Sequence, residues 1–145
     1  GIGIVEIYDR DPFGSAFLLN LSPRGYVGVG DQRMVGGVVV GGANPSTADV
    51  VLRARGPSIH SSVPGRLADP GMVVYQGASP RYAVSDWGTG SSAAAFGAAP
   101  YDTYAPSQPF EAASVDSLAP GAHTVVVSGA GSTTGVGIFE VFAIY

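Results

Sequence analysis

The chain contains no cysteine and no lysine, and it has few charged residues of any kind. Without cysteine it can form neither disulfides nor cysteine-ligated metal sites, so the fold must rest on its hydrophobic core. Only 12% of the 145 residues are charged, about half of the roughly 25% usual in soluble domains. All seven basic residues are arginine, and eleven carboxylates give a net charge of −4. Such a surface lacks the positive field that binds nucleic acid or anionic lipid, so we expect neither partner.

Hydrophobic runs long enough to cross a membrane as a helix are also missing. The most apolar stretch, residues 34–43, has ten residues, and four of them are glycine. A spanning helix needs about 20 apolar residues, so we expect no membrane insertion. Residues 1–6 lack the basic region that opens a signal peptide, and we expect that any such peptide has already been removed.

Short β-rich runs, closed by glycine, proline, aspartate and serine, dominate the sequence. This pattern predicts an all-β fold, an antiparallel β-sandwich or jelly roll of about 8–10 strands, with residues 1–145 forming one domain. At most one short helix is expected, in the alanine-rich residues 91–98. The strands are expected at about 1–8, 15–20, 25–29, 34–41, 49–55, 72–76, 81–85, 111–117, 122–128 and 135–145.

The two ends of the chain repeat each other. Gly1-Ile-Gly-Ile-Val-Glu-Ile-Tyr8 matches Gly135-Val-Gly-Ile-Phe-Glu-Val-Phe142, with four identities and four conservative exchanges. The chain therefore opens with a copy of the strand that closes it. We predict that the N-terminal copy is exchanged with a neighbouring unit. The contact residues are then Gly1, Ile2, Gly3, Ile4, Val5, Glu6, Ile7 and Tyr8.

Several motifs occur in an ordered series that resembles a known family. They are Arg24-Gly-Tyr-Val-Gly-Val-Gly-Asp31, Val35-Gly-Gly-Val-Val-Val-Gly-Gly42, Val51-Leu-Arg-Ala-Arg-Gly-Pro-Ser58, Val63-Pro-Gly-Arg-Leu-Ala-Asp-Pro70 and Leu118-Ala-Pro-Gly-Ala-His-Thr-Val-Val-Val-Ser-Gly129. Together with residues 131–142 they resemble the tandem β-sandwich repeat of large secreted and surface proteins of environmental bacteria. The C-terminal third is also similar to bacterial prepeptidase-type β-sandwich domains. The resemblance implies an extracellular or cell-surface bacterial protein without catalytic activity.

The residues that could carry catalysis or bind metal are few. His60 and His123 are the only histidines, and neither stands in a recognisable nucleophile motif. We therefore expect no enzyme activity and no cofactor. Asp9 and Asp11 begin like a calcium loop, but Phe13 occupies a position that needs an oxygen ligand. An Asp-Pro turn explains this segment better than a metal site does.

Two other groups of residues are candidates for contacts. Arg53 and Arg55 lie on the same face of one expected strand, which invites carboxylates across the sheet. Glu6 and Glu140 are the natural partners, because each interrupts an apolar strand; solvated surface charge is the alternative. An aromatic contact loop is the other candidate. It comprises Trp87, Tyr101, Tyr104 and Phe110.

These features predict a structural or adhesive module of an extracellular fibre or cell-surface array. Exposed sheet edges are normally protected by charge, above all by lysine, and this chain has none. Its expected partners are copies of itself, as a homopolymer or as a tandem neighbour. Two alternatives stay open: a carbohydrate-binding module that holds a polysaccharide with the aromatic loop, and a passive spacer repeat within a longer secreted protein.

Overall fold

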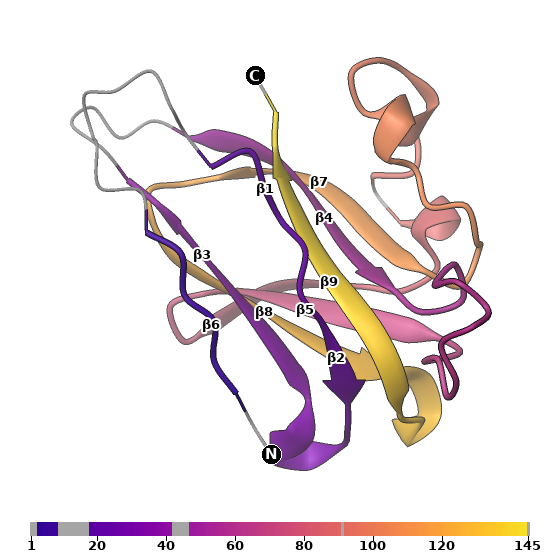
Figure 1. The fold of residues 1–145 in the computed structure, drawn as a ribbon. Coiled ribbons are helices and arrows are strands. Elements are labelled where there is room, and N and C mark those ends of the chain that lie inside the picture. The colour runs from indigo at the N-terminus through magenta and orange to yellow at the C-terminus, as the bar shows by residue number, and fades with distance from the viewer. Residues whose placement is uncertain (1–2, 9–17, 42–46, 91, 145) are drawn as a thin grey trace.

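A computed structural model of the chain describes residues 3–8, 18–41, 47–90 and 92–144. Within these residues, nine strands form two antiparallel sheets that pack face to face as a β-sandwich, which confirms the predicted fold class (Figure 1). The strands are β1 (Asn20–Leu21), β2 (Arg24–Val27), β3 (Met34–Val40), β4 (Ala48–Arg55), β5 (Pro70–Gln76), β6 (Ser79–Val84), β7 (Ala112–Leu118), β8 (Gly121–Gly129) and β9 (Gly135–Ala143).

The first sheet has the order β1-β9-β4-β7, and β2 pairs with β9 on the same side as β1. The second sheet has the order β3-β8-β5-β6. β9 is therefore an interior strand with partners on both sides, whereas β3 and β6 are the edges of the second sheet. No described helix is long and apolar enough to span a membrane.

Alternating side chains build the core between the sheets. On β4, Val50, Leu52 and Ala54 point inward, and Val51, Arg53 and Arg55 point outward. Inward residues of the other strands complete the core. They include Val27, Met72, Val74, Leu118, Val125, Val127, Phe139 and Val141.

A segment between β6 and β7 covers the outer face of the first sheet. It contains the 3-10 helices η2 (Trp87–Thr89), η3 (Ala95–Gly97) and η4 (Asp102–Tyr104), seen beside β7 and β4 in Figure 1. Phe96 is buried there against Val51 and Ala113. The alanine-rich run thus forms a 3-10 helix, and the described residues contain no α-helix. Two further 3-10 helices occur in turns, η1 (Gly30–Gln32) and η5 (Ala130–Ser132).

The strand expected at residues 1–8 is not formed within the chain. Residues 3–8 belong to neither sheet and are drawn as a plain tube outside them (Figure 1). Their sequence matches that of β9, and β9 itself occupies the interior position in the first sheet. Of the strand expected at 15–20, only Asn20 lies in a described strand, and residues 15–17 are outside the described residues.

Candidate functional site

Residues 3–8 form an exposed apolar segment at the N-terminus. Ile4 and Val5 are 84% and 80% exposed, and Ile7 and Tyr8 are also exposed. The neighbouring carboxylate of Glu6 raises the pKa of the Tyr8 hydroxyl. Four large apolar side chains within five residues are therefore presented to solvent, which makes the segment a candidate contact surface.

The matching residues of β9 are, by contrast, tightly packed. A Cβ atom at Gly135 would lie 2.6 Å from the carbonyl oxygen of Gly65, and one at Gly137 would lie 3.0 Å from Val27. The aromatic ring of Phe139 is fully buried against Gly36 of β3. In β9 the glycines are needed for close approach of neighbouring backbone. Gly3 has open space around it in this chain.

Glu140 of β9 anchors the two outward arginines of β4. One Glu140 oxygen lies 2.7 Å from both Nε and Nη2 of Arg53, and the other lies 3.2 Å from Nη1 of Arg55. The Ser22 hydroxyl donates a third, longer bond to Glu140. The guanidinium of Arg53 also lies over the ring of Phe142, 4.9 Å from its centroid. The arginines are thus held by an ion-pair network under the covering segment.

Glu6, the other predicted partner of these arginines, does not join them. Its side chain is exposed, and among the described residues it forms no ion pair with Arg53 or Arg55. The pairing with Glu6 is therefore wrong within one chain, because residues 3–8 lie outside the sheet that carries the arginines.

A second carboxylate, Glu111, was not anticipated from the sequence. It is fully buried, and its Oε1 accepts hydrogen bonds from the amides of Gly56 and Ser58 and from the Ser58 hydroxyl. Its Oε2 lies 4.0 Å from Nε of Arg55 and has no hydrogen-bond partner among the described residues. The Gly56-Pro57 turn is the sequence signal that could have indicated such an acceptor. The amides of Gly56 and Ser58 have no partner within the turn and need one once they are buried.

The histidines are engaged in local contacts. His60 is exposed, and its Nδ1 lies 2.9 Å from the Ser62 hydroxyl and accepts a bond from the Ser62 amide. His123 is buried, with Nε2 2.7 Å from the carbonyl oxygen of Ala119. The Ser58 hydroxyl donates to Glu111 and not to His60. These contacts stabilise turns. Asp9 and Asp11, the calcium candidates, lie outside the described residues.

The four residues of the predicted aromatic loop do not form one stacking platform. Trp87 meets Phe96 edge-on, with ring centroids 5.7 Å apart, and its Nε1 donates to the carbonyl oxygen of Gln108. Tyr104 packs against Phe142, and Tyr101 joins the same cluster over the first sheet. Phe110 alone is largely exposed, at one side of a shallow groove that Trp87 also lines.

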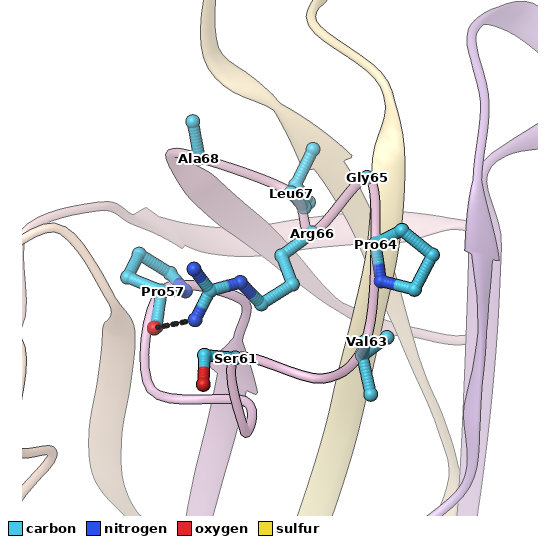
Figure 2. Close-up of a pocket in the computed structure, with 8 residues that line it drawn as sticks. All are labelled: Pro57, Ser61, Val63, Pro64, Gly65, Arg66, Leu67 and Ala68. Atoms are coloured by element: carbon cyan, nitrogen blue, oxygen red, sulfur yellow. Dashed lines mark hydrogen bonds between the residues drawn. The ribbon is translucent and has the colours of Figure 1, made fainter.

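A second hollow lies in the loop that joins β4 to β5 (Figure 2). Arg66 extends across it, and its Nη1 donates to the carbonyl oxygens of Pro57 and Ile59. The neighbouring Leu67 is fully buried in the core. The guanidinium here closes the loop by bonding its carbonyls, so the hollow surrounds a structural contact.

Comparison with known proteins adds no relative. The resemblance to the tandem β-sandwich repeat stays a prediction from the motifs of this chain, because no protein-family model, no curated protein and no solved structure matches it.

Proposed function

We propose that this domain is a structural or adhesive module of an extracellular fibre or cell-surface array. In this proposal copies associate by β-strand addition, and residues 1–8 of one copy are the added strand. The observation that carries the proposal is the exposed segment 3–8, which has the sequence of an interior strand and no strand partner among the described residues of its own chain. An apolar segment of this kind gains hydrogen bonds and burial when it joins a neighbouring sheet.

The low charge of the chain supports the same function. A net charge of −4 without any lysine leaves few charges to protect a free sheet edge against association. In an assembly such edges are covered by neighbours. The segment and the surface that receives it differ, so each contact is head-to-tail. Repetition of such a contact builds an open filament when the rotation between copies does not close a ring.

The test compares the full chain with a variant that lacks residues 1–8. We expect the full chain to associate as its concentration rises and the shortened chain to be a monomer with nearly the same thermal midpoint, since the segment belongs to neither sheet. Size-exclusion chromatography with light scattering gives the mass, and a thermal melt gives the stability. A control variant with Ile4, Val5 and Ile7 changed to serine keeps the chain length and should also be monomeric.

Three outcomes would count against this function. A full chain that stays monomeric would refute self-association. A shortened chain that still associates would show that residues 1–8 are not the contact strand. A shortened chain with a much lower thermal midpoint would show that the segment belongs to its own domain. Mass spectrometry of the native polypeptide separates a free subunit from the spacer alternative, in which the unit is one part of a longer tandem chain.

Carbohydrate binding is the weaker proposal. The groove beside Phe110 is open, but the indole of Trp87 is held by Phe96 and Gln108 and is not free to stack on a sugar ring. Binding on a glycan array that disappears when Phe110, which lines the groove, is changed to alanine would promote it.

A further inference from the structure

Residues 1–8 need a free sheet edge to join, because the interior strand position that their sequence matches is occupied by β9. β9 fills that place from within the same chain, with partners on both sides. Phe139 of β9 packs against Gly36, whereas the matching residue of the segment is the smaller Val5. Replacing β9 by the segment would leave a cavity in the core. The added strand must therefore lie at an edge.

Three of the four sheet edges are poor acceptors. The outer edge of β7 is covered, since the amide of Val115 donates to the Ser92 hydroxyl, which in turn donates to the Val115 carbonyl oxygen. β6 contains Pro80 and Arg81, and its pairing with β5 includes a bulge. β1 and β2 are short and are separated by Ser22-Pro23. Charge, proline, bulges and short length all discourage strand addition.

β3 is the edge without such protection. It has seven residues and contains neither a charged residue nor a proline. Its pairing with β8 is regular over its whole length, and among the described residues its backbone bonds to β8 alone. Val35 and Val39 on its outer face are 63% and 79% exposed, and the space around Gly37 is open. A strand placed there would find free backbone groups and uncovered apolar side chains.

The segment matches β3 in length and in pattern. It has eight residues against seven, and both are almost wholly apolar. In a strand, Val5 and Ile7 would share one face, and Ile4 and Glu6 the other. The first face would extend the core beyond the partly buried residues of β3, and the second would cover Val35 and Val39 while leaving the one carboxylate toward solvent. Partly buried core neighbours on β3 are Met34, Val38 and Val40.

We infer that β3 of a second copy is the edge to which residues 1–8 add. This inference rests on the proposed function and names its acceptor. Donor and acceptor lie on different parts of the chain, so one copy both gives a strand and receives one. The second sheet (β3, β8, β5 and β6), called sheet B below, thereby becomes five-stranded at each contact.

The test places one lysine on each free edge of sheet B in the full chain. Val39→Lys adds a charge to the exposed outer face of β3 and should weaken association at least roughly tenfold, because lysine on an edge opposes strand pairing. Ala83→Lys adds the same charge to the edge of β6, at another exposed residue. This matched control has the same net charge and should associate like the unchanged chain. Val39→Thr, which keeps the β-branched shape, should also associate.

Mixing variants then tests the direction of the contact. Val39→Lys retains the donor segment, and the chain without residues 1–8 retains the acceptor edge. Each should be monomeric alone, and an equimolar mixture should give a heterodimer that grows no further. The β3 assignment would be overturned by either of two results. One is a Val39→Lys variant that still associates as the unchanged chain does, and the other is an equimolar mixture that stays monomeric. A full chain that never associates would instead overturn the proposed function, so the two failures are distinguishable.

Discussion

Glu140 is the residue whose chemistry differs most from that of its surroundings. It lies on an otherwise apolar strand, is nearly buried, and pairs with both Arg53 and Arg55. A buried ion pair adds little net stability over apolar packing, because desolvation offsets the attraction. Removing one partner is costly, since the remaining charge stays buried. The network therefore fixes the register of β9 against β4, where Arg53 lies opposite Glu140.

We expect Glu140→Gln to lower the free energy of unfolding by about 3–5 kcal/mol, because two arginines lose their carboxylate in a nearly buried place. Urea unfolding measures the change. The control is Arg81→Gln, which breaks the more exposed ion pair with Asp116 and should cost about 0–1 kcal/mol. Equal losses in the two variants would show that the Glu140 network has no special role in holding β9.

Two adjacent glycines on β3 have opposite surroundings, and they illustrate the element scale. A Cβ at Gly36 would overlap the ring of Phe139, whereas a Cβ at Gly37 would meet nothing within 4 Å. Gly36 therefore lets the edge strand approach β9 across the sandwich, and Gly37 faces solvent. Substitutions at these two glycines can therefore test the core packing of β3 and its solvent-exposed face independently.

Alanine at these two positions should have different effects on stability. Gly36→Ala should destabilise the fold by about 1–3 kcal/mol, because the Phe139 ring has to move within a packed core. Gly37→Ala should be neutral or stabilising by up to about 1 kcal/mol, since glycine weakens a strand interior. Urea unfolding at a concentration where the protein is monomeric compares them. A neutral Gly36→Ala would contradict the close packing of Phe139 on β3.

Most elements of the fold could be predicted from local sequence, because alternation and turn residues act over short distances. The strands from β2 to β9 lie within a few residues of their predicted positions. The same pattern predicted a strand at residues 1–8, and within the chain this was wrong for residues 3–8, because pattern does not reveal whether a partner strand is free. Glu111 was missed for a related reason, since its contacts with Gly56 and Ser58 join residues more than 50 positions apart.

At the scale of the whole molecule, one chain offers an apolar segment outside both sheets and an unprotected edge in one of them. Neither feature helps the isolated domain, since an exposed apolar strand and an uncharged edge both promote association. Their combination on one chain is what a self-associating structural module requires. The central claim is that residues 1–8 of one copy pair with the β3 edge of the next.

Hydrogen–deuterium exchange of the full chain, measured by mass spectrometry below and above the concentration of association, tests this claim most directly. The account predicts that amides of residues 3–8 and of β3 become protected together in the assembled state, because both gain strand hydrogen bonds. Amides of the β6 edge should exchange equally fast in both states. Protection confined to β6 or to the aromatic groove, with residues 3–8 still exchanging freely, would contradict it.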